Sequence, residues 1–153
     1  SSQLAKADCT TTVRVSKVKV AENGKQAIFL NPKRRPFTKT RVDGCVIVNS
    51  VACDWLVQDD DVTSILIELK GCDVDHAIEQ IEATLSFMKA NALLTKQIAA
   101  LIVCSKPSRH PSFTAKLQKA KARISLQYKA PLHVVTGSHE FEMERLLSHA
   151  GPR

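Results

Sequence analysis

The spacing of apolar residues predicts a strand-rich beginning to the chain. Residues 12–20 (TVRVSKVKV) alternate apolar and polar side chains with period two, which is typical of a half-buried strand. The pair Asn23-Gly24 then predicts a hairpin turn, with a possible return strand at 26–30. Residues 31–39 (NPKRRPFTK) indicate a basic loop, because two prolines interrupt them.

Three more strands are expected at 42–49, 53–57 and 64–70. Consecutive aspartates at 59–61 predict a polar turn between the last two, and Gly71 ends the pattern. A helix is expected next, with Cys72 or Asp73 near its start, because apolar residues recur at helical spacing at Val74, Ala77, Ile78, Ile81, Leu85 and Met88.

The last third of the chain predicts strands alternating with helices. Residues 98–104 (IAALIVC) form a continuous apolar run, which is expected of a strand buried on both faces. A loop at 107–111 precedes a helix capped by Ser112 that reaches about residue 123. A strand at 132–136 and a helix capped by Ser138, ending near residue 149, complete the order. This order favours an α/β fold, with a mixed sheet whose later strands are joined by helices.

Length and composition are those of one soluble globular domain. The chain has 153 residues, of which 44% are hydrophobic and 24% charged. It contains no apolar run of about 18 residues and no secretory signal pattern, so we expect neither a membrane span nor export. The first residue is Ser1 rather than Met, which is expected of a processed terminus or of a piece of a longer protein.

The cysteines predict a reducing compartment, and we therefore expect a cytoplasmic protein. Their number is odd and none form a CxxC pair, which favours neither a disulfide framework nor a zinc ribbon. Most lie in apolar runs, where a reduced thiol behaves as a small hydrophobic side chain. They are Cys9, Cys45, Cys53, Cys72 and Cys104.

Charge is segregated along the chain, whose net charge is +7. Residues 1–43 carry ten Lys/Arg and three Asp/Glu, and residues 89–136 carry nine Lys/Arg and no carboxylate. Between them, residues 44–88 carry nine carboxylates and a single base, Lys70. This pattern favours a protein that holds phosphates with its flanks and a cation with its centre, although chance clustering on the surface explains it equally well.

The acidic centre contains a candidate catalytic set. Glu68 and Lys70 lie two residues apart on an expected strand and therefore share a face. If the strand of Asp54 pairs with this one through the acidic turn, Asp54 lies beside Glu68. Two neighbouring carboxylates need a cation to stay ionised, and Mg²⁺ is bound by such carboxylates together with backbone carbonyls, waters and phosphates. An exposed ion pair is the commoner reading of an isolated Glu-x-Lys. The apolar neighbours of both residues favour metal-assisted phosphodiester hydrolysis here.

At these positions the sequence resembles the PD-(D/E)XK nuclease superfamily, with Asp54, Glu68 and Lys70 matching its motif and Cys53 standing where the motif has proline. The resemblance covers about residues 42–104 and implies a restriction-endonuclease-like αβββαβ core, with a mixed central sheet flanked by helices. It also implies an Mg²⁺ site (Mn²⁺ substituting) on Asp54, Glu68 and the Leu69 backbone carbonyl. Gln80 matches a helical glutamine that faces the site in small nucleases of this type.

We therefore expect one nuclease-like domain, made of a basic N-terminal hairpin and loop (1–41), a catalytic core (42–104) and a C-terminal helix-strand-helix (105–153). The expected function is Mg²⁺-dependent endonucleolytic cleavage of duplex or structured DNA, by a possible homodimer. Basic residues are expected to line a groove for the phosphate backbone. They are Lys33, Arg34, Arg35, Lys39 and Arg41 before the site, and Lys106, Arg109, Lys116, Lys119, Lys121 and Arg123 after it.

Alternatives to the nuclease and to its single metal site are also open. The same fold could bind nucleic acid or a protein partner without cutting, or serve as an RNA-gripping subunit of a larger assembly. Asp73, Asp75 and His76 could form a second metal site, but more often such residues cap a helix. Asp59, Asp60 and Asp61 lack the EF-hand pattern and are read as a solvated turn. The histidines at 110, 133, 139 and 149 show no metal-binding spacing.

Overall fold

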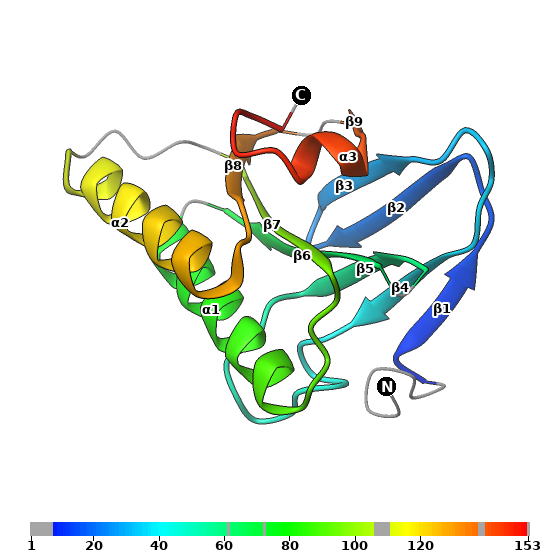
Figure 1. Cartoon of the computed structure of the whole chain (residues 1–153), viewed down its shortest axis with the longest axis horizontal. Coiled ribbons are helices and arrows are strands. Elements are labelled where there is room, and N and C mark those ends of the chain that lie inside the picture. The colour runs from blue at the N-terminus through cyan, green and yellow to red at the C-terminus, as the bar shows by residue number, and fades with distance from the viewer. Residues whose placement is uncertain (1–7, 61, 72, 106–110, 138–139, 153) are drawn as a thin grey trace.

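Two sheets and two long helices make up most of the computed structural model, which describes residues 8–60, 62–71, 73–105, 111–137 and 140–152 (Figure 1). The helices are α1 (Val74–Ala90), α2 (Pro111–Tyr128) and the short α3 (Met143–Leu146). The strands are β1 (Thr10–Val13), β2 (Lys17–Glu22), β3 (Lys25–Leu30), β4 (Phe37–Arg41), β5 (Trp55–Asp59), β6 (Thr63–Lys70), β7 (Gln97–Cys104), β8 (Leu132–Thr136) and β9 (Glu140–Phe141).

The larger sheet has six strands in the order β1-β4-β5-β6-β7-β8. Strands β1, β4, β5 and β6 pair antiparallel with their neighbours, whereas β6, β7 and β8 run parallel. The parallel steps pass through α1 and α2, because a parallel connection must return the chain to the same end of the sheet. The carboxyl ends of β6, β7 and β8 therefore share one edge with the amino ends of α1 and α2.

Both faces of the six-stranded sheet are covered (Figure 1). Side chains alternate along β6, so Leu66 packs in the core under α1 and α2, while Ile65 and Ile67 pack in a second core. The smaller sheet, β2-β3-β9, and helix α3 cover that second face. The predicted class, an α/β fold with a mixed sheet flanked by helices, is confirmed.

The predicted strand at 12–20 is two strands in different sheets. β1 pairs with β4 in the larger sheet, whereas β2 pairs with β3 in the smaller one. Residues 14–16 between them carry the chain from one sheet to the other. Alternation continues through this crossing in the sequence, so the period alone did not reveal the break. The predicted hairpin at Asn23-Gly24 is present and joins β2 to β3.

The prediction of a strand at 42–49 is wrong. The Val42 carbonyl accepts backbone N–H bonds from Cys45, Val46 and Ile47, which closes a tight loop. Gly44 has a φ of 77°, a left-handed conformation that permits this turn and that other residues rarely adopt. The run is apolar because Val42 and Ile47 enter the core from the loop, not because it is extended.

The C-terminal helices differ from expectation. α2 begins at Pro111, so Ser112 lies inside the helix rather than capping it, and proline is favoured at that first position. α2 also continues to Tyr128, beyond the predicted end. The last helix, α3, is shorter than the helix expected up to about residue 149, because residues 140–141 form strand β9 and pair with β3. The predicted cap Ser138 lies outside the described residues.

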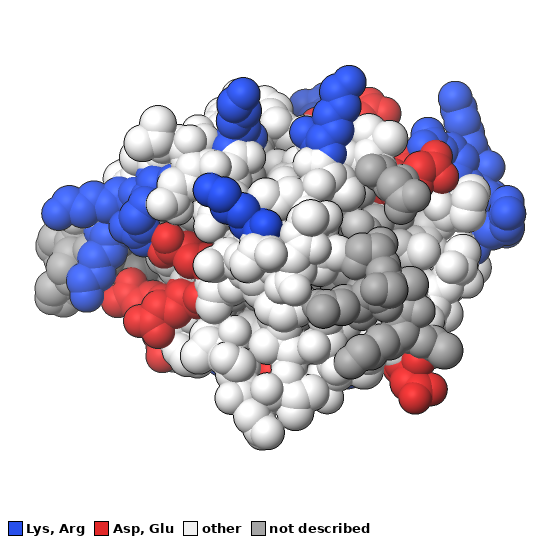
Figure 2. Space-filling view, turned by 60° about the horizontal axis from the view of Figure 1, so that its bottom comes forward, with Lys and Arg blue, Asp and Glu red and all other residues white. Residues whose placement is uncertain are grey.

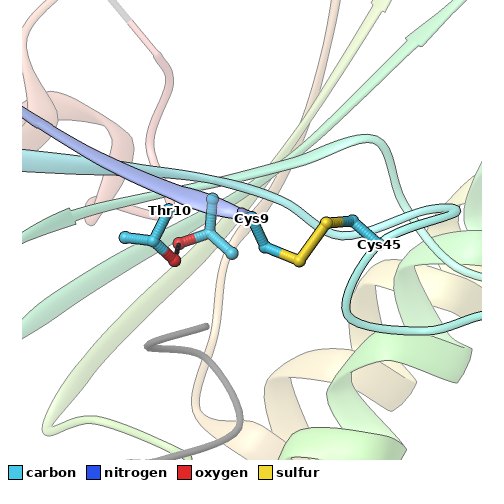
Figure 3. The surroundings of a disulfide bond; sticks show 4 residues. Cys9, Thr10 and Cys45 are labelled. Atoms are coloured by element: carbon cyan, nitrogen blue, oxygen red, sulfur yellow. Dashed lines mark hydrogen bonds between the residues drawn. A yellow bond between two sulfur atoms is a disulfide. The ribbon is translucent and has the colours of Figure 1, made fainter. Parts of the chain in front are cut away.

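A disulfide bond joins Cys9 to Cys45 (Figure 3). The expectation that these two cysteines are reduced is therefore wrong. Their separation of 36 residues gave no short spacing to notice, and the pairing of β1 with β4 brings them together. Cys53 and Cys104 are buried thiols, as predicted, and Cys72 lies outside the described residues. Within the described part of the chain, no helix is long and apolar enough to cross a membrane.

Reduction of the Cys9–Cys45 bond is expected to lower the free energy of unfolding by about 3–4 kcal/mol, because the bond restricts the unfolded chain. Thermal melting with and without dithiothreitol checks this, with an expected fall of roughly 10 °C. The Cys9→Ser/Cys45→Ser variant should melt at the reduced temperature and ignore the reductant. Equal melting of wild type and this variant under oxidising conditions would contradict the disulfide.

Candidate active site

Asp54, Glu68 and Lys70 meet at the carboxyl end of β6. The antiparallel register pairs Trp55 with Ile67, so the residue before Trp55 lies opposite Glu68. β5 and β6 are joined through the acidic turn, as the sequence reading required. The predicted motif residues thus lie together, at the edge of the sheet where α1 begins.

Two hydrogen bonds lock Asp54 to β6. The Asp54 backbone N–H donates to Glu68 Oε1 at 3.0 Å, and the Leu69 N–H donates to Asp54 Oδ2 at 2.9 Å. These bonds continue the β5–β6 pairing through side chains after the backbone ladder has ended. Because the N–H and C=O of one strand residue point to the same side, the Leu69 carbonyl also faces Asp54.

Glu68 and Lys70 share a face of β6 but differ in exposure. The Glu68 side chain is only 1% exposed, while that of Lys70 is 29% exposed. Lys70 Nζ lies 3.7 Å from Glu68 Oε2. The Lys70 ammonium is therefore the more solvent-accessible of these two charged groups.

The site is electrostatically unfavourable for two ionised carboxylates. Burial and the charge of Asp54 raise the pKa of Glu68 to about 8, although Lys70 opposes the shift. Burial also raises the pKa of Asp54, and the negative charges of Glu22 and Asp43 add to the effect. The pair therefore retains a proton near neutral pH, and a bound cation would favour its loss.

Helix α1 supports the backbone that carries Asp54. Gln80 Nε2 donates to the Ala52 carbonyl at 3.1 Å. Thr84 Oγ1 accepts from the Cys53 N–H and donates to the Gln80 carbonyl, both at 2.8 Å. Thr84 was missed by the sequence reading, although its position four residues after Gln80 puts it on the same helix face.

Gln80 is buried, with 7% of its surface exposed. Its amide nitrogen is used, but Gln80 Oε1 is a buried oxygen with no hydrogen-bond partner among the residues that the structure describes. Burying an unsatisfied polar atom costs free energy, so this oxygen is suited to accept a bond from water or a ligand.

The donor set fits a hard cation. Among the described residues, no group of three or more His, Cys, Asp or Glu side chains is placed to hold a metal. Mg²⁺ does not need such a cage, because one or two carboxylates, waters and substrate phosphates complete its coordination. Asp54, Glu68 and the Leu69 carbonyl supply oxygen atoms only, which suits Mg²⁺ or Mn²⁺ better than Zn²⁺.

The other acidic clusters have structural partners. Asp73 caps α1 by accepting a bond from the His76 N–H at 3.0 Å. Asp75 lies 3.4 Å from Lys116, and His76 pairs with Glu79. Asp59 and Asp60 in the acidic turn bind Arg35. Asp61 of that turn lies outside the described residues.

The predicted basic groove is only partly assembled. Arg41, paired with Trp55 across β4 and β5, lies near Asp54. By contrast Arg35 pairs with Asp59 at the opposite end of β5, so Lys33, Arg34 and Arg35 lie at the far end of the sheet, roughly 15 Å away along the strand. Lys39 faces the smaller sheet and donates to the Lys19 carbonyl.

Helix α2 carries the later basic residues beside the acidic residues of α1. Figure 2 shows Lys and Arg side chains at the left margin, where α2 lies, next to a group of acidic side chains. Lys116 pairs with Asp75, and Arg123 pairs with Glu82. Lys119 is exposed. Lys106 and Arg109 lie outside the described residues.

A cleft of about 820 Å³ lies away from these carboxylates. Its lining includes Arg35, Asp59 at the end of β5, Thr63 at the start of β6 and Met143 of α3. Thr63 and Glu68 are five residues apart on an extended strand, or roughly 17 Å. The concave surface and the carboxylate pair are therefore separate features.

Comparison with protein-family models, curated proteins and solved structures found no significant match.

The pH dependence of stability tests the carboxylate pair. The raised pKa of Glu68 means that the folded chain binds more protons than the unfolded chain between pH 4.5 and about 8. Stability should therefore fall as pH rises through this window. The quantity to compare is the melting temperature of wild type minus that of Glu68→Gln, both measured in EDTA. We expect this difference to be roughly 5 °C or more lower at pH 8.5 than at pH 5.

Addition of Mg²⁺ or Mn²⁺ should raise the melting temperature of wild type more at pH 8.5 than at pH 5, because protons compete with the cation. Glu68→Gln should lose most of this response. In EDTA, melting temperatures of wild type and Glu68→Gln that change in parallel with pH would show that Glu68 has an ordinary pKa.

Proposed function

We propose that this chain is an Mg²⁺-dependent nuclease with a restriction-endonuclease-like core of the PD-(D/E)XK type. The observation that carries the proposal is the pair of carboxyl groups, Asp54 and Glu68, held together beside Lys70 at the carboxyl end of β6. The succession β4-β5-β6-α1-β7 supports it, because three antiparallel strands, a helix and a parallel strand match the βββαβ part of the expected αβββαβ core.

Each site residue has a distinct proposed role. Asp54, Glu68 and the Leu69 carbonyl would hold the cation, which when bound polarises a phosphate and favours ionisation of water. Lys70 is the more exposed member of its ion pair with Glu68, and its ammonium would orient an attacking water or offset charge developing on the phosphate. Its placement 3.7 Å from Glu68 Oε2 supports this role.

Gln80 has two proposed functions through its two amide atoms. Its nitrogen fixes the Ala52 carbonyl and so the path of the chain into Asp54. Its unpartnered oxygen would accept a hydrogen bond from water in the site. The substrate proposed is duplex or structured DNA, since aromatic residues make up only 5% of the chain and offer little surface for stacking single strands.

The burial of Glu68 favours one alternative, a module of the same fold that binds nucleic acid or a protein without cutting. A carboxyl group that is 1% exposed and bonded to a backbone N–H also serves to hold β5 against β6. This alternative predicts binding that is independent of divalent cations, so it is separated from the nuclease by the same assay.

Nicking of supercoiled plasmid in Mg²⁺, Mn²⁺ or EDTA tests the proposal. Wild type should cleave only with a divalent cation, and Glu68→Ala and Lys70→Ala should each lower the rate at least about 100-fold, because the removed groups act in the transition state. Glu82→Ala is a matched control, since this glutamate lies on α1 and pairs with Arg123.

Glu82→Ala should retain the wild-type rate. Cleavage that survives in Glu68→Ala would reject the assigned site. An absence of cleavage in every cation, with DNA binding intact, would favour the non-catalytic module.

A further inference from the structure

The tip of the β2–β3 hairpin lies against the candidate active site. Lys25, the first residue of β3, pairs with Glu22 across the Asn23-Gly24 turn. Its side chain reaches Gly71, which directly follows Lys70: a β-carbon placed on Gly71 would lie 4.0 Å from Lys25 Cε and 3.9 Å from Ser105 Oγ. A segment far away in the sequence thus forms part of the surface beside the catalytic strand.

Contacts with β4 and β5 fasten this tip in place. Trp55 Nε1 donates to the Ala21 carbonyl at 3.2 Å. Arg41 Nη1 donates to Glu22 Oε2 at 2.9 Å, and its guanidinium lies 4.6 Å from the centre of the Trp55 ring. Because Trp55 directly follows Asp54, the strand that presents the carboxylate also positions the hairpin.

The Lys25 ammonium has no carboxylate partner within ion-pair distance among the described residues. It donates to the Asn23 carbonyl at 3.5 Å, which is the limit of a hydrogen bond. Other cations of this region are neutralised: Arg41 by Glu22 and Lys116 by Asp75. Lys25 therefore lies beside the site and carries a positive charge that no carboxylate of the described residues neutralises.

We propose that Lys25 binds a phosphate of the substrate strand next to the one that is cleaved. This inference rests on the proposed nuclease function and adds a substrate-binding residue from outside the catalytic core. The smaller sheet and α1 lie on opposite faces of the larger sheet, so the nucleic acid backbone would cross the sheet edge between the hairpin tip and the start of α1. Lys25 anchors the strand on the hairpin side, and Lys70 meets the reacting phosphate.

The absence of a side chain at Gly71 serves this arrangement. The glycine keeps side-chain atoms out of the space between Lys25 and Ser105, which a single β-carbon would occupy at ordinary contact distance from both residues. The Ser105 hydroxyl donates to the Gly71 carbonyl at 2.8 Å, which fixes the glycine backbone. The residue pattern gave no sign of Lys25, because it lies in an ordinary turn outside the motif.

DNA binding in the Glu68→Gln background tests the proposal separately from catalysis. The probe is a fluorescein-labelled duplex of 30 base pairs, titrated by anisotropy in EDTA over a range of salt concentrations. Lys25→Met removes the charge but keeps an apolar stem over Gly71. It should weaken binding roughly 5- to 10-fold and reduce the slope of log K against log salt by about one.

Lys96→Met is the matched control, since exposed Lys96 precedes β7 at the opposite end of the sheet. It should weaken binding less than about twofold and leave the slope of log K against log salt nearly unchanged. Lys25→Arg should restore most of the affinity lost in Lys25→Met. All variants should melt within about 2 °C of their parent, which separates phosphate binding from a packing role.

Equal binding by Lys25→Met and Lys96→Met would overturn the inference, and so would a failure of the parent to bind DNA. Plasmid nicking by wild type reports the nuclease independently. Metal-dependent nicking combined with equal binding by the two methionine variants would reject Lys25 alone.

Discussion

The structure around the candidate site depends on the electrostatic repulsion between two carboxyl groups, those of half-buried Asp54 and buried Glu68. Asp54 and Glu68 are tied to β6 and to each other by backbone hydrogen bonds, which prevents them from separating when both ionise. Charge repulsion and burial therefore appear as a raised pKa of Glu68, and Lys70 only partly compensates. Such a pair favours binding of either a proton or a cation, and that competition links stability, pH and the proposed catalysis.

The fold supplies the rigidity that this repulsion requires. β6 is paired on both sides, and side chains of α1 hold the residues that lead into Asp54. The Cys9–Cys45 bond secures the loop whose residues Val42 and Asp43 donate to the carbonyls of Asp54 and Cys53. On the other face, the β2–β3 hairpin is fastened by Trp55 and Arg41. Elements from most of the chain thus converge on one short stretch before β5.

Local patterns predicted the parts of this structure that depend on local forces. The apolar run of β7, the helical spacing of α1 and the Glu68–Lys70 alternation each follow from burial of one or both faces. The disulfide and the contact of Lys25 with Gly71 depend on pairing between distant strands, and no local period encodes them. The loop at 42–49 was mistaken for a strand because an apolar loop that enters a core has a strand's composition. Lys33, Arg34 and Arg35 precede the site in sequence, yet the length of β5 separates them from it.

Calorimetry of Mg²⁺ or Mn²⁺ binding in buffers of different ionisation enthalpy tests the competition between proton and cation most directly. If Asp54 and Glu68 share a proton near neutral pH, binding at pH 7 should release about one proton per cation, and binding at pH 9.5 almost none. Glu68→Gln should bind more weakly and release none. Cation binding without proton release at pH 7, or equal binding by Glu68→Gln, would contradict the account.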